Sequence, residues 1–195
     1  MEPFHARSHV CWHVYGLIYR SERNYNEAIQ AYKQALRIDK DNIQILKDLG
    51  LLQIQMRDLE GFTKTQHAIL ELKPNLKVNW LAFALGKHMN GDLDGAIEVI
   101  DIFLGTLEED SPDLKKSYET SELAHYKNSI IAETGDWKKA LDHLKKKKKK
   151  DILVDRLAYL KLTGHYQLQL GQFDEGKETF MQLFERGSTE DYSVH

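Results

Sequence analysis

A run near the C-terminal end of the chain has the spacing of a phosphate-binding loop. Gly171 to Lys177 fits G-x4-G-K. Such a loop needs a Ser or Thr after the lysine and a place between a strand and a helix, so that backbone N–H groups surround a phosphate. Residue 178 is Glu, and Asp174 and Glu175 would repel phosphate. With no G-x-G pair elsewhere, we disfavour a nucleotide-dependent enzyme and predict no cofactor.

A second group has the residue types of a metal site. His9 and His13 are four residues apart and would share one helix face, as zinc ligands often do. Cys11 points to another face, and no H-E-x-x-H or C-x2-C pair occurs. We therefore favour a packed Cys11 and a His13 that lines the inner groove over a metal site. The acidic run Glu108 to Asp110 ends a helix before Ser111-Pro112, which favours a solvated face over paired catalytic carboxylates.

The densest charge in the chain is a run of lysines. Because successive helical residues are 100° apart, six consecutive lysines cover every face of a helix, and we expect the run not to pack. It is either a frayed, solubilising helix end or an electrostatic contact for a phosphate backbone such as ribosomal RNA. The run comprises Lys145, Lys146, Lys147, Lys148, Lys149 and Lys150, with Lys138 and Lys139 nearby.

Composition limits the class of protein. The 195 residues hold 27 Lys+Arg and 30 Asp+Glu, a net charge of −3, which argues against a general nucleic-acid binder but leaves a local basic patch open. One cysteine allows no intramolecular disulfide and fits a reducing compartment. The N-terminal stretch lacks a secretory signal, and the apolar stretches are too short to cross a bilayer. We expect a cytoplasmic protein with no membrane partner.

The elements that would position these groups recur every 34 residues in the first three units, then after 44 and 36 residues. The small residues Ala28, Ala96, Ala140 and Gly176 occupy one repeat position, where two helices would cross. The first unit matches the tetratricopeptide signature W-x2-L-G-x2-Y, then A-x3-F. We therefore predict an all-α, right-handed tetratricopeptide-repeat (TPR) solenoid of about five helix pairs rather than a bundle of unrelated hairpins. The matching residues are Trp12, Tyr15, Gly16, Tyr19, Ala28, Tyr32 and Ala35.

The repeat also predicts boundaries and helix caps. Asn24, Asp58, Asp92 and Asp136 precede the second helices, where a short polar side chain can accept from first-turn N–H groups, and Asn24 with Glu27 forms a near capping box. Ser111-Pro112 predicts a helix start that lengthens the first helix of unit four. The predicted organisation is a leader 1–8, one array 9–190 with units 9–42, 43–76, 77–110, 121–154 and 157–190, an insertion 111–120, and a tail 191–195.

The first helices of the units should line an inner face, as in other helical-repeat arrays. Clamp-type repeats that grip acidic C-termini carry Lys, Asn, Asn, Lys and Arg on this face. The sequence has instead His13, Leu17, Asp48, Val78 and Ala82, so the clamp is absent. The face is largely apolar and suits a partner helix or folded domain. The predicted partner-binding groove consists of His13, Leu17, Leu51, Ile54, Leu81 and Leu85.

A longer run resembles a known family. Ser8 to Phe62 contains SHVCWHVYGL and LLQIQMRDLEG, and Asn79-Trp80 follows. These residues resemble the auxiliary subunit of the N-terminal acetyltransferase A complex. The resemblance covers about residues 8–105, is weaker over 121–144, and returns at DRLAYL and QLQLGQFDEG. Because members of that family are much longer, the chain matches an early portion of them.

The resemblance implies a non-catalytic scaffold that binds the catalytic acetyltransferase subunit and helps dock it at the ribosome for co-translational N-terminal acetylation. It implies no small-molecule substrate for this chain. The acetyl-CoA loop of the catalytic subunits reads R/Q-x-x-G-x-G/A, and none of the 12 glycines here has Arg or Gln three residues before it. The alternative is an independent TPR adaptor that holds an unrelated helical client.

Overall fold

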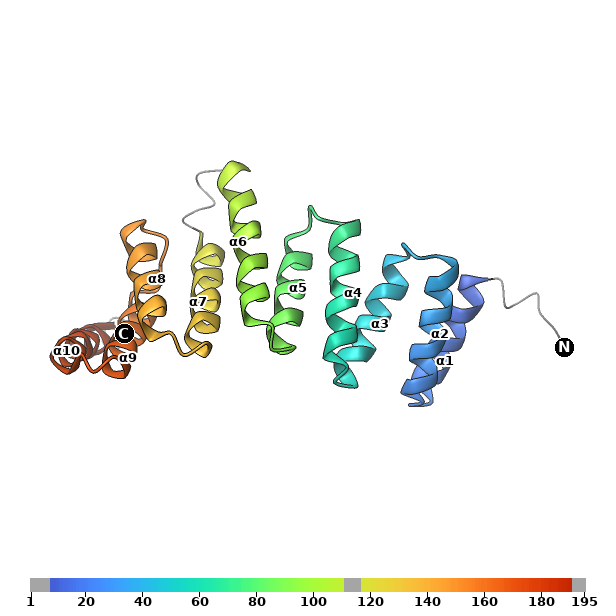
Figure 1. Ribbon diagram of the computed structural model, residues 1–195, viewed down its shortest axis with the longest axis horizontal. Helices are drawn as coiled ribbons and strands as arrows, with labels where there is room; N and C mark the ends of the chain where they lie inside the picture. The colour runs from blue at the N-terminus through green and yellow to red at the C-terminus, as the bar shows by residue number, and fades with distance from the viewer. Residues whose placement is uncertain (1–7, 111–116, 191–195) are drawn as a thin grey trace. The chain divides into compact units, whose positions relative to one another are not determined.

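The computed structural model describes residues 8–110 and 117–190, apart from the side chains of 107–110 and 187–190. All regular secondary structure in these residues is helical (Figure 1). The chain divides into two compact units, Met1–Val99 and Ile100–His195. The helices are α1 (His9–Ser21), α2 (Tyr25–Ile38), α3 (Ile43–Gln55), α4 (Leu59–Leu72), α5 (Lys77–Met89), α6 (Leu93–Asp110), α7 (Tyr118–Glu133), α8 (Trp137–Lys149), α9 (Arg156–Gln169) and α10 (Phe173–Glu190).

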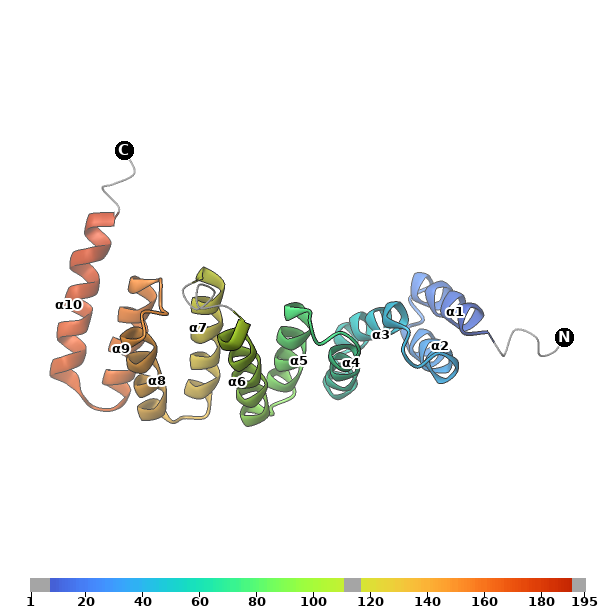
Figure 2. The same cartoon turned by 90° about the horizontal axis from the view of Figure 1, so that it is seen from above.

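Within each unit, helices pack mainly against their neighbours in sequence. In the first unit, α1 packs on α2, α2 on α3, α3 on α4 and α4 on α5. In the second unit, α7 packs on α8, α8 on α9 and α9 on α10, and the α9–α10 hairpin is clear in Figure 2. This local order of contacts is typical of helical repeats, in which each repeat touches only its neighbours.

The turn inside each helix pair has the same geometry in every repeat. Its second residue has positive φ: 62° at Arg23, 59° at Arg57, 83° at Gly91, 82° at Gly135 and 74° at Gly171. In the turns at Arg23, Arg57, Gly91 and Gly171, the amide that follows bonds back to the preceding helix, as Asn24 N does to Tyr19 O at 2.8 Å. This left-handed residue ends the helix and satisfies its last carbonyls, and it usually is glycine because a Cβ is strained there. Two of the five positions carry arginine instead.

The predicted caps of the second helices are confirmed at three of four positions. Asp58, Asp92 and Asp136 each accept a hydrogen bond from a first-turn backbone N–H at 2.9 Å. The prediction for Asn24 and Glu27 is wrong, because the Asn24 side chain makes no cap hydrogen bond. The φ and ψ of Asn24, −85° and 72°, resemble those of Asp58 and Asp136, so its backbone takes the cap conformation without the side-chain bond. Three first helices, α3, α7 and α9, also have side-chain caps, which the repeat pattern did not predict: Asn42, Ser117 and Asp155.

Small residues let paired helices approach at the predicted crossings. Ala28, Ala96 and Ala140 are fully buried. At Gly16, an added Cβ would lie 2.3 Å from Cε1 of Tyr32, which is itself fully buried in the core of the first unit. The close distance between α1 and α2 therefore requires a glycine at position 16, where the Tyr32 ring packs.

The insertion is described only in part. Ser111 and Pro112, where the sequence predicted a helix start, lie outside the described residues. Helix α7 begins at Tyr118, where Thr120 N donates to Ser117 Oγ at 3.2 Å. The predicted leader and tail also fall largely on residues that the structure does not describe. Among the described helices, none is both long enough and apolar enough to cross a bilayer.

Candidate functional site

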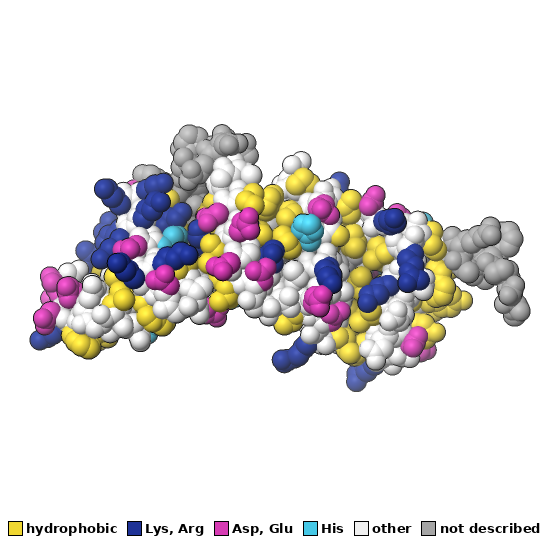
Figure 3. Space-filling model, viewed as in Figure 1, with side chains coloured by type: hydrophobic (Ala, Val, Ile, Leu, Met, Phe, Trp, Pro, Cys, Tyr) yellow, Lys and Arg dark blue, Asp and Glu magenta, His cyan; other side chains and the backbone are white. Residues whose placement is uncertain are grey.

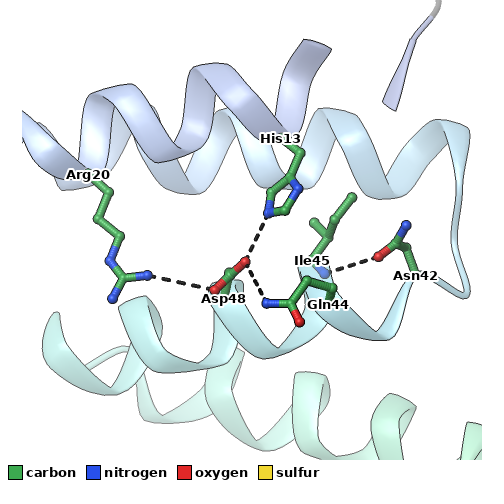
Figure 4. A network of polar contacts seen from close by, with 6 residues as sticks. All are labelled: His13, Arg20, Asn42, Gln44, Ile45 and Asp48. Atoms are coloured by element: carbon green, nitrogen blue, oxygen red, sulfur yellow. Dashed lines mark hydrogen bonds and ion pairs between the residues drawn. The ribbon is translucent and has the colours of Figure 1, made fainter. Parts of the chain in front are cut away.

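A carboxylate lies between the first helices of repeats one and two (Figure 4). Asp48, on α3, is 8% exposed and contacts both α1 and its own helix. Its Oδ2 lies 2.9 Å from His13 Nε2 and accepts from Gln44 Nε2 at 3.2 Å. Its Oδ1 lies 3.7 Å from Arg20 Nη1. The arrangement fixes α1 against α3 through a charge that is paired and hydrogen-bonded rather than isolated.

This network occupies part of the predicted groove and was not anticipated from the sequence. His13, expected in the groove, lies against Asp48 and retains 21% side-chain exposure. Burial of the phenol raises the pKa of Tyr32, and the charge of Asp48 raises it further. A signal was present: His13 and Asp48 are 35 residues apart, so they lie one position apart in adjacent repeats. An acid among the buried Leu46, Leu49 and Leu52 needs a partner.

The other predicted groove residues lie on α1, α3 and α5 of the first unit. Leu17 is 41% exposed, Leu51 58% and Leu85 42%. Ile54 and Leu81 are half-buried. These helices therefore present large aliphatic side chains to solvent, together with the edge of the Asp48 network.

The lysine run is helical rather than frayed. Seven of the thirteen residues of α8 are lysines, and the helix continues to Lys149 with Lys150 as its C-terminal cap. Lys and Arg side chains gather over α8 in Figure 3. The expectation that the run does not pack is wrong for Lys148, because its Nζ lies 4.1 Å from the centroid of the Tyr159 ring. Lys147 is also partly buried. A long aliphatic stem lets a lysine cover an aromatic face while its ammonium stays hydrated.

A second polar network is buried in the second unit. Asn128, fully buried on α7, donates from Nδ2 to Ala140 O at 2.8 Å and lies 3.3 Å from His143 Nδ1. Its Oδ1 accepts from Tyr166 Oη at 2.8 Å. Burial, with the charges of Lys127 and Lys147, lowers the pKa of His143 to about 4, so this imidazole is neutral at pH 7. A neutral Nδ1 can accept from Asn128, which joins α7, α8 and α9.

The motifs that suggested nucleotide or metal chemistry have structural roles. Gly171 forms the positive-φ turn before α10. At Gly176, an added Cβ would lie 2.9 Å from Leu168 Cδ2, so this glycine serves helix packing. His9 Nε2 lies 3.7 Å from Asp39, whereas His13 contacts Asp48. In the described part of the chain, no three His, Cys, Asp or Glu side chains are grouped to hold a metal. The side chains of Glu108, Glu109 and Asp110 lie outside the described residues.

Family models match two parts of the chain. Residues 16–56 match a tetratricopeptide-repeat model, which together with the ten described helices confirms the predicted all-α repeat fold. Residues 118–193 match the model described as "N-terminal acetyltransferase A, auxiliary subunit". The two matches fall in different units, so each unit has its own family evidence.

Curated relatives match nearly the whole chain. The N-terminal acetyltransferase A complex auxiliary subunit NAA15 of Arabidopsis thaliana is 43% identical over 189 residues, 97% of this chain and 21% of that protein. The N-alpha-acetyltransferase 16, NatA auxiliary subunit of Mus musculus is 42% identical over 180 residues, 92% of this chain and 20% of that protein. The chain thus spans about a fifth of the length of these relatives.

A solved structure described as Naa15/Naa10 bound to HypK-THB gives the same result in three dimensions. It superposes with a TM-score of 0.83 at 39% identity, and the match covers 92% of this chain and 26% of that one. Sequence and fold therefore agree over most of the chain. By both measures the chain is a relative of the auxiliary subunits of N-terminal acetyltransferase A (NatA).

Proposed function

We propose that the chain is a non-catalytic scaffold that binds a catalytic N-terminal acetyltransferase subunit. The observation that carries this proposal is the 43% identity to a NatA auxiliary subunit over 97% of the chain. It is supported by the fold match to a chain whose solved complex contains Naa10. The cytoplasm, where nascent chains are acetylated, is the expected location.

The first unit supplies the surface for this partner. Leu17, Leu51 and Leu85 expose aliphatic side chains on first helices, and such side chains stabilise a complex when a partner helix covers them. The Asp48 network joins α1 to α3, the helices that carry Leu17 and Leu51. A preorganised apolar face loses little entropy on binding, which favours affinity.

Co-purification tests the partner. The chain is co-expressed with the catalytic subunit, once as wild type and once as Leu17→Asp/Leu51→Asp/Leu85→Asp. Wild type should retain the catalytic subunit, and three new charges in the apolar contact should reduce retention by roughly tenfold or more. The matched control is Ile38→Asp/Met56→Asp/Met89→Asp, which changes three exposed apolar residues of the same unit and should retain binding.

Loss of retention in the control as well would contradict the groove assignment. If the wild-type chain retains no catalytic subunit at all, the scaffold proposal fails, and the independent TPR adaptor becomes the better description. Circular dichroism on each variant separates a lost contact from a lost fold.

The second proposed contact is with the ribosome, through the lysine run. Five of the six lysines are exposed, and the run stands at the end of α8. Clustered lysines bind phosphate backbones by releasing counterions, so affinity falls steeply with salt. We infer that ribosomal RNA is the phosphate backbone concerned.

Ribosome sedimentation over a salt series tests this contact. Replacing Lys145 to Lys150 with Gln should weaken association and flatten its salt dependence by roughly 0.7 to 0.9 in log–log slope for each lost phosphate contact. The control replaces six dispersed exposed lysines with Gln, which gives the same change in net charge. Equal weakening by both variants would point to general charge and contradict a contact at the run. The control lysines are Lys33, Lys40, Lys47, Lys73, Lys161 and Lys177.

A further inference from the structure

A cavity of about 310 Å³ lies in the second unit, where the end of α8, the following loop, α9 and α10 meet. Three of its lining side chains are cationic: Lys148 from α8, Arg156 from α9 and Arg186 from α10. One lining side chain, Asp151, is acidic. Cations from three different helices therefore line one open, solvent-accessible cavity, which distinguishes it from the lysine run along a single helix.

The backbone around the cavity is held in place on both sides of the loop. Asp151 has a φ of 58°, and its N–H donates to Lys148 O at 2.9 Å, which ends α8. Further along the loop, Val154 N donates to Ser121 Oγ at 3.0 Å, and Ser121 is fully buried on α7. The Asp155 side chain then caps α9 by accepting from Ala158 N at 2.9 Å. A loop tied at its two ends holds the lining side chains of α8 and α9 at fixed separations.

Lys148 is itself positioned by an aromatic wall of the cavity. Its Nζ lies 4.1 Å from the centroid of the Tyr159 ring, and both side chains line the space. A cation over an aromatic face is held there by the ring quadrupole. The ammonium of Lys148 is therefore directed by the Tyr159 ring.

The lining matches an organic phosphate better than a carboxylate or a bare ion. Arg guanidinium groups bind phosphate oxygens through two parallel hydrogen bonds, and a doubly charged phosphate monoester can satisfy several cations at once. Leu153 and Leu160 provide an apolar wall, and Gln182 with Asp151 can bond hydroxyl or amino groups. The volume falls at the lower end of the ~300–1,000 Å³ range of small-molecule pockets.

We propose that this cavity binds a small organic phosphate monoester of the size of a nucleoside monophosphate, with Arg156, Arg186 and Lys148 on the phosphate. The site is separate from the G-x4-G-K run, because Lys177 does not line the cavity. It also goes beyond the proposed scaffold function, since neither the first-unit groove nor ribosome association is required for it.

Calorimetric titration of the full chain tests the site with adenosine monophosphate, adenosine and inorganic phosphate as probes. Adenosine monophosphate should bind, and adenosine, which lacks the phosphate, should bind at least roughly tenfold more weakly. Inorganic phosphate should also bind more weakly, because it leaves the apolar wall unfilled. Failure of adenosine monophosphate to bind, or equal affinity for adenosine, would overturn the proposal.

Variants then assign the phosphate contact. Arg156→Gln and, separately, Lys148→Gln should each weaken adenosine monophosphate binding by roughly tenfold. Lys161→Gln on α9 and Lys177→Gln on α10 change exposed lysines outside the cavity and should leave affinity within about twofold of wild type. Equal losses in all four variants would show a general charge effect and refute the site. Because Arg156 and Lys148 are exposed, circular dichroism should show the same helix content in every variant.

Discussion

The two units hold their helices together with polar networks of different kinds. In the first unit, the network centres on a carboxylate, Asp48, whose side chain keeps 12% exposure and whose partners Arg20 and His13 reach solvent. In the second unit, it centres on the neutral amide of Asn128, which is fully buried with Tyr166. A charge tolerates burial when it has charged partners near water, whereas a neutral amide can be enclosed completely.

The surfaces of the units differ in the opposite sense. The first unit exposes aliphatic residues such as Leu51 and Val78 on its first helices. The second unit carries seven lysines on α8 alone and a cavity with three cationic lining residues. The difference suggests a division of labour, with protein contact in the first unit and phosphate contact in the second.

The largest expected effect on the free energy of unfolding is the difference between removing Asn128 and removing Asp48, the central residues of the two networks. Asn128→Ala should lower the free energy of unfolding by about 3 kcal/mol, because it leaves buried groups on Ala140 and Tyr166 without their partner. Asp48→Ala should cost only about 1 kcal/mol, because Arg20 and His13 can regain water. Urea unfolding of both variants measures the difference. A greater loss for Asp48→Ala would reverse the comparison.

Acid should weaken the second unit through His143. Its pKa of about 4 in the folded chain lies below the unfolded value near 6.5, so above pH 6.5 both states are neutral and nothing is lost. As pH falls from about 6.5 to about 4, the unfolded chain binds the proton first, and stability should drop by up to about 3 kcal/mol.

The measurement is urea unfolding at pH 7.5, 5.5 and 4.5, with His143→Gln as the comparison because glutamine retains an acceptor for Asn128 but does not titrate. The variant should lose less stability in acid than wild type. An identical pH dependence would remove His143 from the explanation. Hydrogen exchange in α7 to α9 locates the change in the second unit.

The glycines at the helix crossings should respond differently in the two units. Gly16→Ala places a Cβ 2.3 Å from Tyr32 Cε1, and the fully buried ring cannot move away, so we expect a loss of about 2 kcal/mol. Gly164→Ala places its Cβ 2.8 Å from Phe180 Cε2, but that ring is half-buried and can turn. The better helix propensity of alanine should then leave a net change near zero. Thermal unfolding ranks the two, and equal losses would contradict the argument.

The smallest effect concerns the turns inside the helix pairs. Arg57→Gly in the first unit should raise stability by about 0.5 kcal/mol, because it relieves a side chain at a φ of 59°. Gly135→Ala at the matching turn of the second unit should lower it by about 1 kcal/mol. Denaturant midpoints of the paired variants test the common geometry. A loss of stability in Arg57→Gly would contradict the prediction and mean that side-chain contacts of Arg57 outweigh its backbone strain.

The periodic features were predictable because repeat position determines local geometry. Asp58, Asp92 and Asp136 cap their helices by contacts three residues away, and Ala28 and Ala140 are buried where the period places them. Such features depend on the helix pair itself. The same local pattern therefore recurs several times in one sequence, and each copy supports the same prediction.

Contacts between different elements were harder to anticipate. His13 contacts Asp48, 35 residues away, and Asn128 contacts Tyr166, 38 residues away. Both contacts depend on how neighbouring helices are rotated relative to one another. The packing of Lys148 on Tyr159 was not predicted, because lysines on every face of a helix indicate no face that packs, whereas a lysine stem can cover an aromatic ring. The cavity beside it needs α8, α9 and α10 together, and no local pattern indicates it.

One experiment tests the division of labour most directly. The variant Leu17→Asp/Leu51→Asp/Leu85→Asp and the variant with Lys145 to Lys150 changed to Gln are each measured for retention of the catalytic subunit and for sedimentation with ribosomes. We expect the first variant to lose the catalytic subunit while keeping the ribosome, and the second to lose the ribosome while keeping the catalytic subunit. Loss of both partners in either variant, with the fold intact, would contradict separate roles for the two units.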